Sequence, residues 1–255
     1  MKKNLRIIFI YFKSLLIRNI FLILIIQSTF FIYTFMNIGY DKKNIFITIQ
    51  ISFMGFNSIN NFLFSWLYLN LPILIILYNF LTQQYSKIRC YIMLKMERIN
   101  MWYISLMVLV IIYIIIYYII GIAVITFFIF LSPMGGELTT QITPSINLAS
   151  QVIYIVAQNY FIIIISFSIW IYIKNYDIGF VCILILHVFF VLLSNNVTAN
   201  GIQYMPLSYG IYFLKQTDIG NLELILKALV EILISSFILL IIVRVKHDDN
   251  VLKKV

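Results

Sequence analysis

The residues of this chain that could take part in chemistry lie within strongly apolar segments. Glu231 is the first candidate, because an ionisable group inside such a segment is by default a candidate site for protons or ions. Lys227 precedes it by four residues, so an ion pair on one face of a helix is the interpretation that we favour. His187 is the other candidate, but no carboxylate lies on its segment, and we interpret it as a hydrogen-bonded packing residue.

No recognisable catalytic motif accompanies these residues. The sequence contains no phosphate-binding loop, no Gly-x-Ser-x-Gly sequence and no His, Cys, Asp or Glu residues at metal-ligand spacing. We therefore predict that the chain is not an enzyme and holds no cofactor or metal of its own. An intramembrane enzyme is the least favoured of the functions considered.

Amide side chains are the second group of interest. Asn60, Asn61 and Asn70 lie in one apolar segment, which also contains a proline, and Gln158 and Asn159 lie in another. Amides in a membrane-spanning helix usually face protein or water instead of lipid. These five residues, together with the histidine, are therefore the candidates for lining a translocation path.

The composition indicates what kind of chain positions these residues. The chain has 255 residues, of which 63% are hydrophobic and 11% charged, with a mean hydropathy of +1.02. Soluble domains have about 25% charged residues, so the sequence predicts an all-α integral membrane protein. The richness in Ile, Asn, Lys, Phe and Tyr is typical of an AT-rich bacterial genome, so we expect the bacterial cytoplasmic membrane. The cysteines, Cys90 and Cys182, imply no disulfide framework.

The apolar runs predict six membrane-spanning helices in a single domain covering residues 1–255. The predicted spans cover residues 19–36, 58–81, 101–130, 148–173, 178–193 and 222–243. Residues 1–18 are expected to form a basic amphipathic helix at the membrane surface, the alternative being a basic flank of the first span. A tight inner turn is expected at 174–177, a re-entrant outer segment between the fifth and sixth spans, and a cytosolic tail at 244–255.

The basic residues predict the orientation of these spans. The net charge is +9, but the cations lie at the ends of apolar runs, which excludes the nucleic-acid binding that a basic chain often suggests. Outer loops hold three cations, Lys42, Lys43 and Lys215. The segments predicted to be cytosolic hold Lys2, Lys3, Arg6, Lys13, Arg18, Lys87, Arg89, Lys95, Arg98, Lys174, Arg244, Lys246, Lys253 and Lys254. Both termini are therefore predicted to be cytosolic.

One charged segment, residues 82–100, separates the second and third predicted spans. Such charges are unfavourable in hydrocarbon, so the segment must leave the bilayer. Its apolar residues recur at helical intervals, which predicts a short amphipathic helix that docks on a cytosolic protein. The alternative is a helix that lies on anionic lipid. The residues expected to make the contact are Lys87, Arg89, Met93, Lys95, Met96, Glu97 and Arg98.

This layout resembles the ABC-2-type permease subunits of bacterial ABC exporters. Residues 204–209, Tyr-Met-Pro-Leu-Ser-Tyr, resemble the proline-containing stretch that these permeases carry after the fifth span. Residues 94–98 followed by Trp102 are similar to the coupling segment of small peptide- and lantibiotic-type permeases. The resemblance implies that ATP is bound and hydrolysed by a separate cytosolic ATPase subunit, and that two permease subunits, the same or similar, pair within membrane lipid.

Two other functions remain open. A stand-alone immunity or resistance protein would act by binding, and a proton-coupled transporter would use Glu231. The amides and aromatics suit peptides, lipids and drugs alike, so the substrate class stays open as well. The choice between a homodimer and a heterodimer is equally open.

Overall fold

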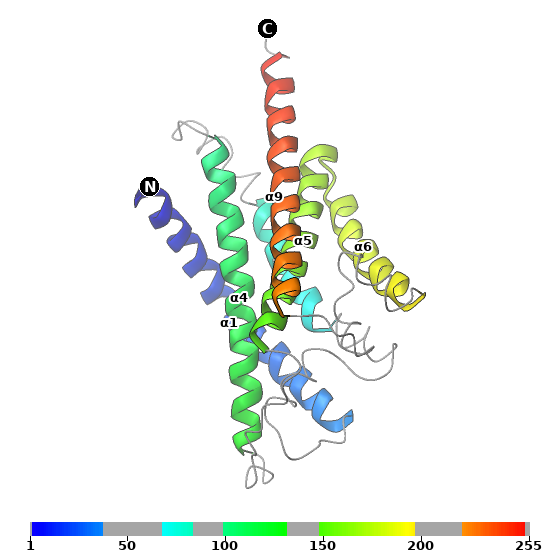
Figure 1. Cartoon of the computed structure of the whole chain (residues 1–255). Helices are drawn as coiled ribbons and strands as arrows, with labels where there is room; N and C mark the ends of the chain where they lie inside the picture. The colour runs from blue at the N-terminus through cyan, green and yellow to red at the C-terminus, as the bar shows by residue number, and fades with distance from the viewer. Residues whose placement is uncertain (1, 38–67, 84–98, 132–147, 197–220, 253–255) are drawn as a thin grey trace.

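The structure is a computed structural model that describes residues 2–37, 68–83, 99–131, 148–196 and 221–252. Every secondary-structure element in these ranges is an α-helix (Figure 1). This confirms the all-α prediction for the described part of the chain. In chain order the helices are α1 (Lys2–Asn37), a helix over Tyr68–Gln83, α4 (Ile99–Leu131), α5 (Leu148–Ile173), α6 (Tyr176–Asn196) and α9 (Asn221–Leu252).

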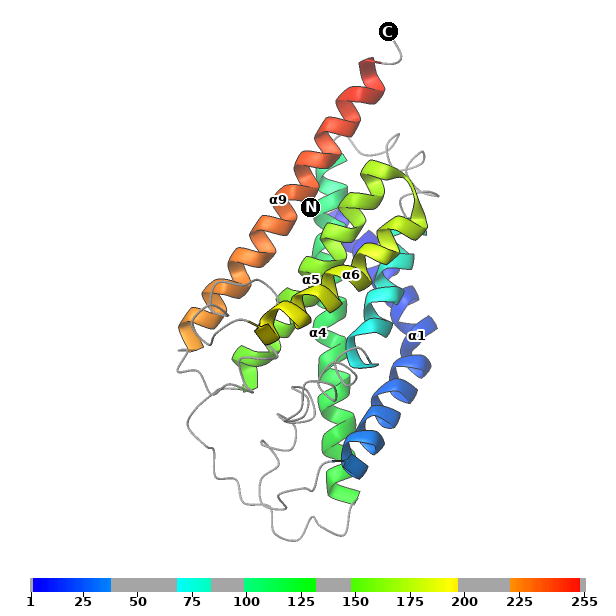
Figure 2. The same ribbon diagram turned by 90° about the vertical axis from the view of Figure 1, so that its right-hand side faces the viewer.

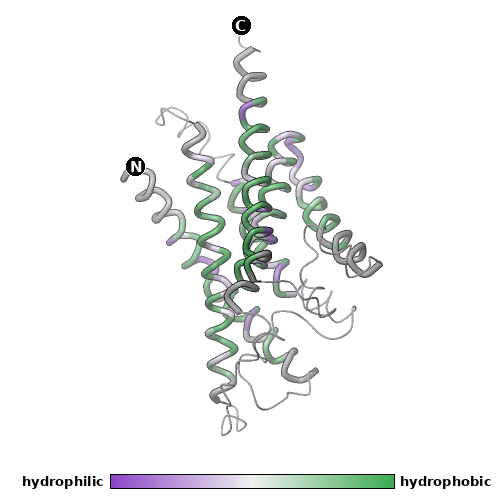
Figure 3. Tube along the Cα trace, viewed as in Figure 1, coloured by the Kyte–Doolittle hydropathy of each residue, from purple (hydrophilic) through white to green (hydrophobic). Residues whose placement is uncertain are grey.

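Four of these helices are long and apolar enough to cross a membrane, which indicates a multi-pass membrane protein. The apolar stretches are Phe12–Ile32, Trp102–Phe128, Val152–Ile173 and Ile225–Val245. Two shorter apolar stretches, Tyr68–Gln83 and Tyr176–Leu186, fall where the second and fifth spans are predicted. Hydrophobic residues dominate the helices, and hydrophilic residues gather at the turn between α5 and α6 (Figure 3). The six-span topology itself stays a prediction.

The N-terminal region is helical throughout its described residues. Residues 2–37 form one unbroken helix, with no break near residue 18 between a surface helix and a span. A continuous helix is compatible with a surface helix that runs on into the span and with a basic flank of the span, so both interpretations stay predictions. The proposed re-entrant segment, at 194–221, lies mostly outside the described residues.

The turn between α5 and α6 is shorter than the predicted 174–177. Lys174 has a φ of 59° and its N–H donates to the Trp170 carbonyl at 2.7 Å, which ends α5 in the left-handed conformation common at helix C-termini. The Asn175 Oδ1 then accepts hydrogen bonds from the N–H groups of Asp177 and Ile178 at 3.0 and 3.3 Å, which makes Asn175 the N-cap of α6. Two residues are thus sufficient to reverse the chain.

Contacts along α5 and α9 show that these helices run in the same direction. Tyr154 of α5 is hydrogen-bonded to Glu231 of α9, and Tyr160 is hydrogen-bonded to Ser236. The partners advance together along both helices, which is the pattern of a parallel pair. The 68–83 helix is also parallel to α5, because Asn70 is hydrogen-bonded to Asn159, and Asn79 and Thr82, further along, lie around one pocket with Trp170.

The first and third predicted spans form a second parallel pair, α1 and α4. Phe12 packs edge-on against Tyr113, with ring centroids 6.3 Å apart, and Phe31 stacks on Phe128 at 5.2 Å. Figure 1 shows the start of α4 and the end of α5 at the same end of the bundle, so these pairs run in opposite directions. Consecutive helices therefore alternate in direction, as the predicted topology requires.

Helix α5 is the centre of the bundle. Its apolar stretch is 67% buried, compared with 22% for that of α9 and 28% for that of α1. The outer helices expose rows of large apolar side chains, which suits contact with lipid. Figures 1 and 2 place the start of α1, the α5–α6 turn and the end of α9 toward one end of the bundle, which we call the turn end.

Candidate functional site

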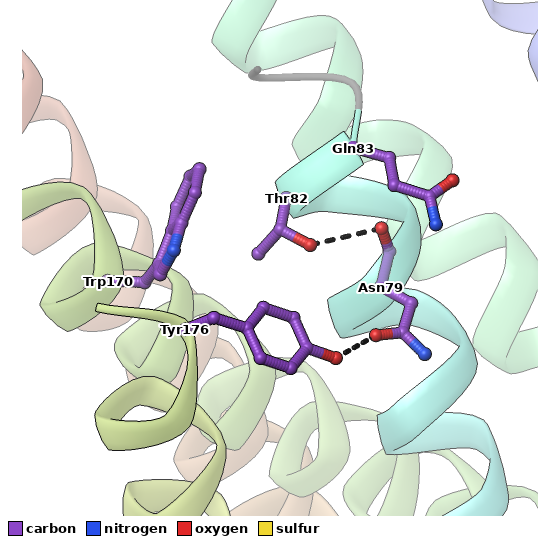
Figure 4. Close-up of a pocket in the computed structure, with 5 residues that line it drawn as sticks. All are labelled: Asn79, Thr82, Gln83, Trp170 and Tyr176. Carbon is purple, nitrogen blue, oxygen red and sulfur yellow. Dashed lines mark hydrogen bonds between the residues drawn. The ribbon is translucent and has the colours of Figure 1, made fainter. Parts of the chain in front are cut away.

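A pocket lies at the turn end between three helices, and we call it the turn pocket (Figure 4). It is open on one side and has a volume of about 430 Å³. Asn79, Thr82 and Gln83 line it from the last turn of the 68–83 helix, Trp170 from α5 and Tyr176 from α6. All five side chains are uncharged, three of them polar and two aromatic.

Hydrogen bonds hold two sides of the turn pocket together. The Tyr176 hydroxyl donates to the Asn79 Oδ1, and the Tyr78 hydroxyl donates to the Tyr176 carbonyl at 2.9 Å. Burial, followed by the charge of Asp177, raises the pKa of the Tyr176 hydroxyl, so this group stays a neutral donor at physiological pH. We call these two hydrogen bonds the tie, because they join the end of the 68–83 helix to the start of α6.

The tie depends on a close approach at Gly179. A Cβ atom added at this position would overlap the Tyr78 hydroxyl and lie 3.1 Å from the Trp170 Cβ. The Tyr78 ring also packs against the Tyr176 ring, with centroids 5.1 Å apart. The absence of a side chain at Gly179 therefore leaves the space that the Tyr78 hydroxyl occupies.

The sequence reasoning singled out none of the five residues of the turn pocket and no part of the tie. Asn79 lies within a predicted span that already contained three noted asparagines, and its position near the end of that span was a usable signal. Thr82 fell at the start of the predicted coupling segment. Trp170 and Tyr176 carry no signal of their own, because aromatic residues are frequent throughout the chain.

A second polar site, the buried amide cluster, lies in the interior and consists of Asn70, Tyr118 and Asn159. The Tyr118 hydroxyl donates to the Asn70 Oδ1, and the Asn159 Nδ2 contacts the same Oδ1 at 2.9 Å and the Tyr118 hydroxyl at 2.7 Å. None of the three is more than 1% exposed. The Asn159 Oδ1 has no hydrogen-bond partner among the described residues.

This cluster brings together two of the predicted path residues, Asn70 and Asn159, from different helices. A hydrogen bond between helices in an apolar interior contributes roughly 0.6 kcal/mol on average. In this conformation the two amides, with Tyr118, join α4, α5 and the 68–83 helix by hydrogen bonds. That they line a path in another conformation stays a prediction.

Gln27 of α1 is a further buried amide that the sequence reasoning did not select. Its side chain is 1% exposed, and neither of its amide atoms has a hydrogen bond of normal geometry among the described residues. It lies near Tyr117, whose hydroxyl donates to the Leu69 carbonyl at 2.6 Å. Asn70 was selected because it is an amide within an apolar stretch. Gln27 meets the same criterion, so it could have been selected from the sequence as well.

Glu231 faces α5 and is 7% exposed. The Tyr154 hydroxyl donates to its Oε1 at 2.9 Å, and the Ser235 hydroxyl donates to its backbone carbonyl at 2.8 Å. The structure thus identifies a partner on a neighbouring helix that the sequence reasoning had not named. The ion pair with Lys227 stays a prediction.

The remaining predicted residues are distributed as follows. Gln158 is buried on α5 with 3% exposure. His187 lies on α6, but its side chain is not among those described. Asn60, Asn61 and the coupling residues at 87–98 lie outside the described residues. In the described ranges, no three His, Cys, Asp or Glu side chains are grouped as metal ligands.

Comparison with protein-family models, with curated proteins and with solved structures gave no match.

Proposed function

We propose that this chain is the permease subunit of an ATP-driven ABC exporter of the ABC-2 type. It moves a hydrophobic or amphipathic substrate, a peptide, lipid or drug, out of a bacterial cell. ATP binding and hydrolysis take place on a separate cytosolic ATPase subunit, and the chain itself is not an enzyme. It pairs in the membrane with a second permease subunit, the same or similar.

The observation that carries the proposal is the tie at the turn end. A permease driven by a separate ATPase needs a mechanical connection from its cytosolic segment to its membrane helices. The 68–83 helix includes the first two residues of the charged segment, 82–100, and the tie joins the end of this helix to Tyr176 of α6. A displacement of the charged segment along the 68–83 helix therefore reaches α6 through two hydrogen bonds and a ring contact.

The directions of the helices support the same proposal. Alternating directions allow six crossings with both termini on one side, and the sequence predicts that this side is cytosolic. The turn end then faces the cytosol, together with the charged segment and the α5–α6 turn. Lys174 and Arg244, which are both exposed, lie toward this end and agree with the positive-inside rule.

The first test concerns the partner. An ABC ATPase is expected to be encoded beside this chain and to co-purify with it as a complex that contains two permease subunits. A transport-competent preparation that contains no ATPase, or a single permease subunit, would contradict the proposal.

The second test concerns coupling and uses reconstituted liposomes. Arg98→Glu and Met93→Asp, in the charged segment, are expected to lose substrate-stimulated ATPase activity because they weaken docking. Tyr78→Phe is expected to keep ATPase binding but to lower the ratio of transport to hydrolysis, because it removes half of the tie. Tyr160→Phe is the matched control, since it removes a hydrogen bond of similar length, to Ser236, far from the tie. Equal coupling ratios for all four variants and the wild type would refute the proposal.

A proton-coupled transporter is the second candidate function, because Glu231 is a buried carboxylate hydrogen-bonded to a phenol. A carboxyl group in this environment could bind and release a proton during transport. Transport driven by a pH gradient without ATP, and abolished by Glu231→Gln at normal membrane levels, would favour this second function over the first.

A further inference from the structure

We infer that the turn pocket binds an extended, uncharged segment of a peptide cargo. The inference rests on the proposed export function, because it identifies the substrate class and its first point of contact. Of the three substrate classes that the sequence leaves open, peptides, lipids and drugs, it selects peptides.

The electrostatics of the pocket argue for an uncharged ligand. The described residues that line it supply amide, hydroxyl and aromatic groups, and none of them is a cation or a carboxylate. Phosphate and carboxylate groups are bound most strongly by Arg and Lys side chains, so the lining does not suit an anionic lipid headgroup. A desolvated cation is bound best beside a carboxylate, and none of the five described lining residues carries one.

The hydrogen-bonding groups of the pocket match those of an extended peptide. The Asn79 Oδ1 accepts from Tyr176, whereas its Nδ2 takes part in none of the hydrogen bonds among the described residues. The Tyr176 hydroxyl donates its proton to Asn79, and its oxygen can still accept. The pocket therefore presents one N–H donor next to one oxygen acceptor. An extended residue presents its own N–H and C=O toward the same side, and it can bond to both.

The apolar surfaces of the pocket can hold a side chain of the same peptide. The Trp170 indole is stacked on Phe167, with ring centroids 5.7 Å apart, which fixes its orientation. The Thr82 hydroxyl bonds to its own helix, which leaves its methyl group toward Trp170 (Figure 4). A volume of about 430 Å³ accommodates an aliphatic or aromatic side chain, and the open side allows the rest of a longer chain to leave the pocket.

The location of the pocket connects binding to the proposed mechanism. The bond between Tyr176 and Asn79 is both a wall of the pocket and one half of the tie. A peptide that bonds to these two residues bridges the 68–83 helix and α6. Cargo binding would thereby strengthen the connection through which the ATPase acts.

The test is a binding measurement on the full chain alone, in nanodiscs of neutral lipid. Trp66→Phe and Trp102→Phe leave Trp170 as the sole tryptophan, so its fluorescence reports on the pocket. The probe is an acetylated and amidated pentapeptide with one phenylalanine and one leucine among alanines. A second probe has an ester in place of the central amide and so lacks one N–H donor.

We expect a saturable change in Trp170 emission with the amide peptide, and binding about threefold to tenfold weaker with the ester, as for one lost hydrogen bond. Tyr176→Phe is expected to bind both peptides equally, because the acceptor of that N–H is gone. Asn79→Leu is expected to weaken both peptides alike. Tyr160→Phe, on the same helix as Trp170 but away from the pocket, should match the wild type.

Three results would overturn the inference. These are no saturable change, equal affinity of the wild type for amide and ester, and an emission change caused by anionic lipid that peptide does not alter. The last would identify a lipid-headgroup site. No ATPase is present in this measurement, so a negative result contradicts peptide binding and leaves the exporter proposal untouched. If the chain binds peptide but has no ATPase partner, the exporter proposal is refuted and peptide binding is not.

Discussion

Three tyrosines of α4 allow the contribution of the buried amide cluster to stability to be measured with one type of substitution. Tyr113, Tyr117 and Tyr118 are each at most 1% exposed. Replacing each by phenylalanine removes a hydroxyl group and keeps the ring, so the packing changes little. The three hydroxyls differ in the number of hydrogen bonds that they make, which predicts a graded effect on the free energy of unfolding.

With Asn70 and Asn159, the Tyr118 hydroxyl makes two hydrogen bonds, one donated to Asn70 and one accepted from Asn159. Its removal leaves no new unsatisfied group, because the Asn159 Nδ2 keeps its bonds to the Asn70 Oδ1 at 2.9 Å and to the Ile155 carbonyl at 3.0 Å. The loss is therefore limited to the net contribution of two bonds, at about 0.6 to 1 kcal/mol each. We expect Tyr118→Phe to lower the free energy of unfolding by about 1 to 2 kcal/mol.

The same substitution at the other two tyrosines gives reference values for this change in the free energy of unfolding. Tyr117 donates one hydrogen bond, to the Leu69 carbonyl at 2.6 Å, so Tyr117→Phe should lower the free energy of unfolding by about half as much. The Tyr113 hydroxyl makes no hydrogen bond of normal geometry among the described residues, since the nearby Asn19 donates to the Leu15 carbonyl at 2.8 Å. Tyr113→Phe removes a buried unsatisfied group and should be neutral or stabilising.

The assay is equilibrium unfolding in mixed detergent micelles, followed by far-ultraviolet circular dichroism, for the wild type and the three variants. The expected order of stability is Tyr113→Phe, then Tyr117→Phe, then Tyr118→Phe as the least stable. If Tyr118→Phe is as stable as Tyr113→Phe, the hydrogen bonds of the cluster contribute no net stability. The reasoning that these amides hold three helices together would then be refuted.

Three further predictions concern charge, topology and packing. Glu231→Gln should keep most of the transport activity of the reconstituted complex, because an amide oxygen can accept the same hydroxyl hydrogen bond; lost transport at normal membrane levels would contradict this. Membrane-impermeant thiol reagents should label a cysteine introduced at Thr139 and miss one at Asp249, and the opposite pattern would invert the topology. Gly179→Ala should lower the free energy of unfolding by about 1 to 3 kcal/mol, because the added methyl group displaces the Tyr78 hydroxyl, and Gly179→Ala combined with Tyr78→Phe should recover part of the loss.

The helical nature of the chain could be predicted from the sequence because its cause is local. In lipid, each backbone N–H and C=O group must be satisfied within its own segment, and a helix does this without any partner. The bounds predicted for the spans at 101–130 and 148–173 accordingly lie close to those of α4 and α5. The turn after α5 was also predictable, since a Lys-Asn pair interrupts a run of apolar residues.

The region around residue 18 shows where local reasoning leaves two alternatives open. The basic, amphipathic pattern before this residue is compatible with a separate surface helix and with a continuation of the span. The structure forms one helix, α1, and no residue near 18 breaks it. Pattern alone did not distinguish the two, because both place the same side chains on a helix.

The candidate sites were decided by tertiary structure. Asn70 and Asn159 were predicted as polar residues within spans, but their meeting at Tyr118 depends on the rotation and register of three helices. The tie between Tyr78, Asn79 and Tyr176 depends in the same way on how closely two helices approach at Gly179. Register is set by the packing of many Ile, Leu and Phe side chains, which are nearly interchangeable in hydropathy and differ mainly in shape. Hydropathy can be read along a sequence, whereas the fit of shapes exists only once the helices are packed together.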